Sequence, residues 1–181
     1  MKKPKFENRK IVANNKYWNV YQSDFIDSKN RKWNVITLKS TKQWDWSFIL
    51  ALTKDSKIIL NKDYKFWANE FIYTLPSGFI EKWLSGKENI LNELKEETWF
   101  VSDSEVIELG KTMQNWYIEW YNQLFFVKDC YKKYEQKTHE WEEIETFLVS
   151  IEEFEKMLNE NKILDPYSEI TYYRAKKLLG I

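Results

Sequence analysis

The chain alternates short apolar runs with polar connections, a pattern typical of several strands and a few helices. The apolar runs at 47–52 and 57–60 are separated by a polar turn at 54–56, and this arrangement predicts a β-hairpin. A further strand is predicted at 70–75. It leads directly into a Pro-Ser-Gly turn at 76–78, where the backbone can change direction sharply.

The N-terminal region carries a second strand pattern. Residues 17–21 and 33–38 are rich in β-branched and aromatic side chains on either side of a polar turn at 27–32, so we expect another hairpin there. Three later apolar runs also predict strands: 106–109, 123–127 and 147–149.

Helices are predicted in three places. Ser85 precedes Glu88 by three residues, which is the spacing of a capping box, and apolar residues then recur at helical intervals, so we expect a helix at 86–98. Two C-terminal helices are predicted by the same kind of start signal, at Ser150 and Asp165.

Length and composition predict one domain. The 181 residues, 43% of them hydrophobic, can bury a single sizeable core, with an N-terminal β extension at 1–40 and the main body at 41–181. Lys and Arg balance Asp and Glu at 28 each, so the charge favours neither nucleic acid nor an anionic membrane as a partner. No apolar run reaches the roughly 18 residues that span a bilayer, and the N-terminus lacks a signal-peptide pattern. The single cysteine, Cys130, excludes an internal disulfide, and we expect a cytoplasmic protein.

The predicted helix at 86–98 carries the candidate chemistry. Glu93, Glu96 and Glu97 stand at positions i, i+3 and i+4, so their carboxylates lie within one or two helical turns of each other. Clustered carboxylates repel one another unless a cation lies among them, and Mg²⁺ or Mn²⁺ accepts such oxygen ligands. A solvated acidic helix face is the alternative interpretation of the same run.

The stretch from Leu75 to Phe100 resembles the signature of the Nudix hydrolase superfamily. Its matches are the opening glycine, the first glutamate with its apolar neighbour, the acidic pair and the closing apolar residue: Gly78, Glu93, Leu94, Glu96, Glu97 and Phe100. Leu84, Asn92 and Trp99 depart from it, because the signature has glutamate, arginine and glycine there. The missing glutamate and arginine resemble a structural ion pair, and losing both leaves no buried charge unpaired.

This resemblance implies a fold, a cofactor and its ligands. The fold would be of the α/β class, an α/β/α sandwich with a central mixed sheet and an N-terminal β hairpin extension. The cofactor would be Mg²⁺, with Mn²⁺ as the alternative. Its expected ligands are the carboxylates of Glu93, Glu96 and Glu97 and the backbone carbonyl of Ser77.

Within the superfamily the chain resembles the ADP-ribose pyrophosphatase and nucleotide-sugar diphosphatase branch. That branch hydrolyses a nucleoside diphosphate linked to another moiety, giving a nucleoside monophosphate and a sugar phosphate. The resemblance places Lys65 and Gly78 at the substrate. It makes Glu142 the preferred catalytic base, with Glu140 second and Glu96 as a further catalytic carboxylate. The leading hairpin implies a homodimer that binds a small-molecule nucleotide and neither nucleic acid nor a membrane.

Two other functions are compatible with the same helix. One is a pyrophosphatase that cleans the nucleoside triphosphate pool, which needs no dimeric cleft. The other is a sensor that binds ADP-ribose without cleaving it, and metal-dependent turnover would exclude that role.

Tryptophan is frequent and glycine rare in this chain. There are ten tryptophans and four glycines, whereas glycine makes up about 7% of an average protein. Trp83 and Trp99 stand where the Nudix family has glycine, and the excess of Lys over Arg fits an AT-rich genome. We hypothesise that many or all of the ten tryptophans are UGA codons meant as glycine. The alternative is a protein that is truly rich in tryptophan.

Overall fold

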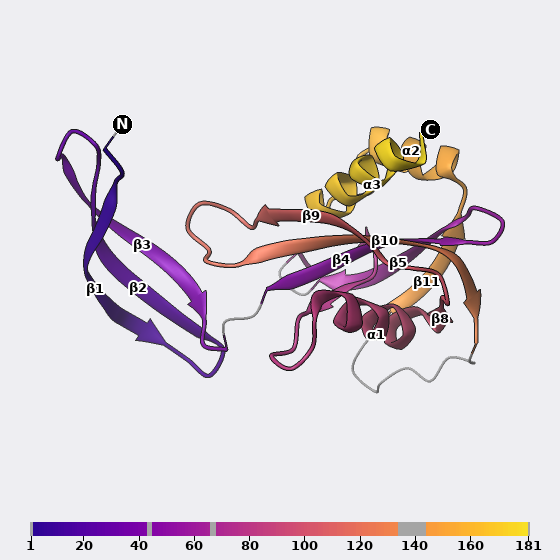
Figure 1. The fold of residues 1–181 in the computed structure, drawn as a ribbon, viewed down its shortest axis with the longest axis horizontal. Helices are drawn as coiled ribbons and strands as arrows, with labels where there is room; N and C mark the ends of the chain where they lie inside the picture. The colour runs from indigo at the N-terminus through magenta and orange to yellow at the C-terminus, as the bar shows by residue number, and fades with distance from the viewer. Residues whose placement is uncertain (1, 43–44, 66–67, 134–143, 181) are drawn as a thin grey trace. The chain divides into compact units, whose positions relative to one another are not determined.

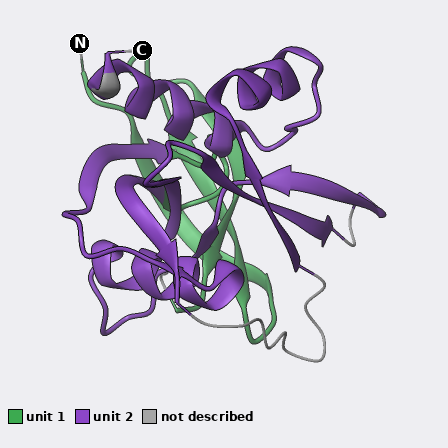
Figure 2. Ribbon diagram, turned by 90° about the vertical axis from the view of Figure 1, so that its right-hand side faces the viewer, with its two compact units in different colours: residues 1–45, 113–121 green, residues 46–112, 122–181 purple. Residues whose placement is uncertain are grey.

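The chain folds into two compact units, shown in separate colours in Figure 2. The computed structural model describes residues 2–42, 45–65, 68–133 and 144–180. These residues form eleven strands and three helices. The first unit comprises 1–45 and 113–121, and the second comprises 46–112 and 122–181.

The first unit is a three-stranded antiparallel sheet in the order β1-β2-β3. The predicted hairpin corresponds to β2 (Trp18–Ile26) and β3 (Lys32–Ser40). Its turn is held by Asp27, whose Oδ1 accepts from the backbone N–H groups of Lys29 and Arg31 at 2.9 and 2.8 Å. The extension is thus built on the hairpin that the apolar pattern indicates.

Strand β1 (Lys5–Asn14) was not predicted from the sequence. Its residues are almost all exposed, and its register with β2 shifts between Glu7 and Lys10 and again between Ile11 and Ala13. These irregularities remove the strict alternation of apolar and polar residues by which a strand is recognised.

Residues 113–121 also belong to the first unit, although the predicted organisation placed them in the main body at 41–181. The backbone of Leu38 on β3 donates to the Tyr117 carbonyl and accepts from the Glu119 N–H, both at 2.8 Å. Glu119 further pairs with Arg9 at 2.8 Å. These bonds join the segment to the sheet in the manner of an additional strand.

The second unit is built on an eight-stranded mixed sheet, with the order β11-β5-β4-β10-β8 along its main path. Strands β4 and β10 are parallel, whereas β6 and β11 pair antiparallel with β5, and β7 pairs antiparallel with β4. The strand bounds are β4 Trp46–Thr53, β5 Ile58–Lys65, β6 Glu70–Thr74, β7 Ser77–Phe79, β8 Phe100–Val101, β9 Ile107–Met113, β10 Tyr121–Lys132 and β11 Ile144–Val149.

The three helices begin where their capping residues predict. Helix α1 (Gly86–Thr98) has the complete capping box between Ser85 and Glu88. Helices α2 (Ile151–Asn159) and α3 (Pro166–Leu179) follow Ser150 and Asp165, whose side chains each accept a backbone N–H from the first turn. None of the described helices is long and apolar enough to cross a membrane.

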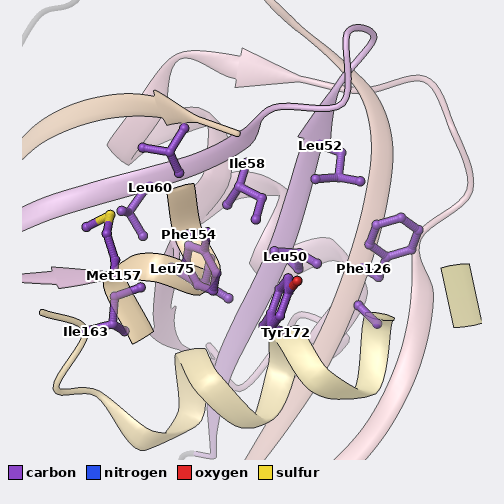
Figure 3. Packing of buried hydrophobic residues seen from close by; sticks show 12 residues of the cluster. Leu50, Leu52, Ile58, Leu60, Leu75, Phe126, Phe154, Met157, Ile163 and Tyr172 are labelled. Carbon is purple, nitrogen blue, oxygen red and sulfur yellow. The ribbon is translucent and has the colours of Figure 1, made fainter. Parts of the chain in front are cut away.

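Helices cover both faces of this sheet, with α1 on one face and α2 and α3 on the other (Figure 1). Strand β4 accordingly is buried on both sides. Leu50 and Leu52 belong to the cluster that includes Phe154 of α2 and Tyr172 of α3 (Figure 3). Ile49 and Ala51 belong to the opposite cluster, which includes residues of α1. This double burial explains the unbroken apolar run at 47–52.

Candidate functional site

The turn after β6 and helix α1 bring Gly78 and Glu93 into contact. A Cβ added to Gly78 would lie 2.1 Å from the carboxyl carbon of Glu93 and 2.2 Å from its Oε1. The carboxylate therefore occupies the space that any other residue at 78 would fill with its side chain. The opening glycine of the motif and its first helical glutamate are matched in space as well as in sequence.

Glu97 lies one turn further along α1 and is held by two donors. Its Oε2 accepts from the backbone N–H of Ser77 at 3.1 Å and from the side-chain amide of Asn61 at 2.9 Å. Ser77 is adjacent to Gly78 on β7, and Asn61 lies on β5. Three elements of the second unit thus fix this one carboxylate.

The environment of Glu97 disfavours its negative charge. Burial raises the pKa of Glu97 well above its usual range, and the negative charge of Glu93 raises it further, with Asp63 acting in the same direction. The Ser77 N–H and the positive charge of Lys65 lower the pKa and only partly oppose these effects. A bound cation would relieve the repulsion between the two glutamates.

Asn61 is almost fully buried, with 2% of its surface exposed. Its Oδ1 accepts from the hydroxyl of Thr146 on β11 at 3.2 Å, and the same hydroxyl is 3.4 Å from the backbone carbonyl oxygen of Glu97. Both ends of the Asn61 amide are therefore engaged. This orients its N–H₂ group toward Glu97, as a buried amide requires.

Lys65 lies at the end of β5 and forms an ion pair with Asp63. Both side chains are partly exposed, and both act electrostatically on Glu97. Lys65 therefore lies within electrostatic reach of the candidate site. Its expected contact with a substrate diphosphate remains a prediction.

The three glutamates that were predicted to bind the metal ion lie in different environments in the structure. Glu93 and Glu97 are half-buried beside the turn, whereas Glu96 is exposed. In the part of the chain that the structure describes, no three Asp, Glu, His or Cys side chains converge in a way that could hold a metal ion. Glu140 and Glu142 lie outside the described residues, so the assignment of the catalytic base stays a prediction.

Two carboxylates nevertheless fit the chemistry of Mg²⁺. This cation is commonly bound by one or two protein carboxylates, while waters and substrate phosphates complete its octahedral shell. Glu93 and Glu97 supply that number at one place, where burial and then the negative charge of Glu93 raise the pKa of Glu97. The donor set is thus compatible with Mg²⁺ or Mn²⁺.

Sequence reasoning missed the polar residues that surround these carboxylates. Asn61 and Asn89 are each 2% exposed, and Ser47 is fully buried. A signal exists for two of them, because Asn61 directly continues the apolar run at 57–60 and Ser47 begins the run at 47–52. Uncharged polar residues at buried strand positions require partners, which here belong to the candidate site.

The three departures from the Nudix signature have different structural consequences. Leu84 is half-exposed and Asn92 is exposed, so neither leaves a buried gap where the ion pair would be. Trp99, in contrast, caps the end of α1 in the left-handed conformation, with φ 66° and ψ 8°. That conformation favours glycine, which is the residue expected there.

Comparison with known proteins shows the fold. No family model and no curated protein matches the sequence. A crystal structure described as that of an ADP compounds hydrolase matches with a TM-score of 0.83 at 18% identity, over 99% of this chain and 96% of that one. The chain therefore has the Nudix α/β/α fold, and the predicted fold class, an α/β protein with a central mixed sheet, is confirmed.

Proposed function

We propose that this protein is a metal-dependent Nudix hydrolase that cleaves the diphosphate of ADP-ribose or of a nucleotide sugar. The products would be a nucleoside monophosphate and a sugar phosphate. The observation that carries the proposal is the Glu93 carboxylate packed on Gly78 beside Glu97, which is itself held by the Ser77 N–H. The likeness to an ADP compounds hydrolase supports ADP-containing substrates in particular.

Glu93 and Glu97 would hold Mg²⁺ or Mn²⁺, with the Ser77 carbonyl and Glu96 as the further ligands that the motif implies. When bound, the cation would neutralise charge on the diphosphate oxygens and lower the pKa of a coordinated water. The packing of Glu93 on Gly78 and the Ser77 N–H bond to Glu97 support this assignment, as does the negative charge of Glu93, which adds to burial in raising the pKa of Glu97.

The chain's own residues would position the reactants. Asn61 and the Ser77 N–H fix one oxygen of Glu97, so that the carboxylate cannot rotate freely. Lys65 would attract the negatively charged diphosphate as a point charge. Glu142, or else Glu140, would accept the proton of the attacking water. Positioning and charge stabilisation supply most of the rate acceleration in phosphoryl transfer.

A second copy of the chain is the partner that we propose. The unit made of 1–45 and 113–121 carries 11 Lys and Arg against 5 Asp and Glu, a charge of +6, so the other unit carries −6. The basic unit also exposes large apolar side chains, including Phe6, Trp33 and Trp116. Opposite charges on the two units of one sequence favour association between copies. Light scattering should give twice the 22.2 kDa chain mass, and a monomer would contradict the dimer.

The test is product analysis over a panel of ADP-ribose, nucleotide sugars and nucleoside triphosphates with Mg²⁺. Release of AMP and ribose phosphate from ADP-ribose, or of the corresponding pair from a nucleotide sugar, supports the proposal. Release of pyrophosphate from a triphosphate would instead identify a pool-cleaning enzyme. Binding of ADP-ribose without turnover would identify a sensor.

A further inference from the structure

Helix α1 contains a buried amide that connects the loop before it to the candidate site. Asn89 lies one turn before Glu93 and is 2% exposed. Its Oδ1 accepts from the backbone N–H of Glu81 at 3.1 Å. Its Nδ2 donates to the hydroxyl of Ser47 at 3.3 Å and to Oε1 of Glu93 at 3.5 Å. Every polar atom of this side chain therefore has a partner.

Ser47 extends the network to the other half of the site. It is fully buried on β4, and its hydroxyl donates to the backbone carbonyl oxygen of Gly78 at 3.0 Å. Asn89 is thus joined directly to Glu93 and, through Ser47, to Gly78. These are the two residues whose contact defines the candidate site.

The hydrogen bonds of Asn89 connect the loop to α1 in a chain that lacks the loop–helix ion pair of the Nudix signature. The Nudix signature has a glutamate and an arginine where this chain has Leu84 and Asn92, so the ion pair implied by the family pattern cannot form here. The loop from Phe79 to Ser85 still has to be held against α1. The bond from the Glu81 N–H to the Asn89 side chain does so without any charge.

We propose that Asn89 is a positioning residue that sets the Glu93 carboxylate against Gly78, in place of the loop–helix ion pair. Its Oδ1 holds the loop, and its Nδ2 presents donors to Ser47 and Glu93. A residue that orients a metal ligand in this way commonly affects metal affinity or activity by about 10–100-fold when it is removed.

The proposal rests on the proposed function only in that Glu93 is a metal ligand. Mn²⁺ affinity, measured by electron paramagnetic resonance on the full chain, therefore tests it without any substrate. Asn89→Leu removes the amide with little change in shape. Asn92→Leu is the matched control, because Asn92 is an exposed asparagine on the same helix.

We expect Asn89→Leu to raise the Mn²⁺ dissociation constant about tenfold or more, and Asn92→Leu to leave it within about twofold. Hydrogen exchange should show that the Glu81 amide loses protection in Asn89→Leu only. A lower melting temperature with an unchanged Mn²⁺ dissociation constant would overturn the proposal, because Asn89 would then be structural alone.

Two further outcomes separate this proposal from the proposed function. Mn²⁺ binding without hydrolysis of any nucleotide overturns the proposed function. The role of Asn89 is then still decided by the Mn²⁺ dissociation constants of Asn89→Leu and Asn92→Leu. No Mn²⁺ binding by the wild-type chain overturns both. If Asn89→Leu does not fold, Ser47→Ala tests the same network, and an unchanged Mn²⁺ dissociation constant in that variant overturns the proposal.

Discussion

The carboxylate of Glu93 lies against the α-carbon of Gly78, where an added Cβ would meet the carboxyl carbon at 2.1 Å. The contact joins β7 to α1, and its two residues stand 15 positions apart in the sequence. Because the overlapping atoms belong to the end of a flexible side chain, a methyl group at 78 would displace Glu93 while the backbone stays in place.

Gly78→Ala should therefore impair the site more than the fold. We expect the free energy of unfolding to fall by no more than about 1–3 kcal/mol, the usual cost of overpacking. Mn²⁺ affinity and turnover should fall at least about tenfold. Ser77→Ala is the control, because it keeps the backbone N–H that donates a hydrogen bond to Glu97. Equal losses in the two variants, by urea denaturation and Mn²⁺ titration, would argue against the Gly78–Glu93 contact.

Glu97 should make the metal-free protein less stable as pH rises. Burial and the charge of Glu93 raise its pKa in the folded chain, so the folded state binds more protons than the unfolded state above the ordinary glutamate range. The stabilisation that protonated Glu97 gives the folded state is complete below the pKa of Glu97 in the unfolded chain. It is lost as pH rises through the higher pKa of Glu97 in the folded chain. Thermal unfolding in chelator should show this decline in the wild type and a weaker one in Glu97→Gln. Identical pH profiles would contradict the raised pKa.

Asn61→Leu should weaken the positioning of the Glu97 carboxylate without changing any charge. Its loss removes the 2.9 Å donor to Glu97 and leaves Thr146 without its acceptor on Asn61. We expect catalytic turnover to fall about 10–100-fold. Thr146→Val removes only the outer partner and should cost less. A larger loss of turnover in Thr146→Val than in Asn61→Leu, measured by steady-state kinetics, would contradict the assignment of Asn61 as the side chain that positions Glu97.

Trp99→Gly should stabilise the protein. Trp99 caps α1 at φ 66°, and the left-handed conformation costs a residue with a side chain about 1–2 kcal/mol relative to glycine. Trp83→Gly serves as the comparison, because Trp83 is 78% exposed and does not have a positive φ. Urea denaturation followed by circular dichroism should show a gain for Trp99→Gly alone. A loss of stability in Trp99→Gly would contradict this interpretation.

The same backbone angles bear on the glycine hypothesis. Among the tryptophans that the structure describes, Trp99 alone has a positive φ. Trp46 instead packs on Phe79 with ring centroids 4.1 Å apart, and Trp18 packs on Trp120 at 4.9 Å. The conformation thus favours glycine at position 99, while at Trp46 and Trp18 the indole rings are used in packing. The codons in the coding DNA test the hypothesis at all ten positions.

Local signals in the sequence predicted most of the main body. The capping residues Ser85, Ser150 and Asp165 located all three described helices, and the apolar run at 47–52 located a strand that is buried on both faces. Strand β1 was missed because it is exposed and its register is irregular. Its pairing depends on contacts with β2 that no local pattern encodes.

The candidate site was predictable only in part, for a related reason. The spacing of Gly78, Glu93 and Glu97 follows a motif, and the structure brings these three residues together. Asn61 and Asn89 belong to no motif. Asn61 reaches Glu97 because α1 packs on the sheet that contains β5, whereas Asn89 reaches Glu93 because the two lie one turn apart on α1. Asn61 and Glu97 are 36 residues apart in sequence, and Asn89 and Ser47 are 42 apart, so only the folded chain identifies these two contacts.

The most direct test is the Mg²⁺-dependent hydrolysis of ADP-ribose by the wild type, Glu93→Gln and Glu97→Gln. Glu169→Gln is the control, because it replaces an exposed carboxylate on α3. We expect kcat/KM to fall by about 10²–10³ in the first two variants and to stay unchanged in the control, with wild-type activity abolished by chelation. Hydrolysis that persists without metal, or that survives both substitutions, would contradict the assignment of Glu93 and Glu97 as the metal-binding pair.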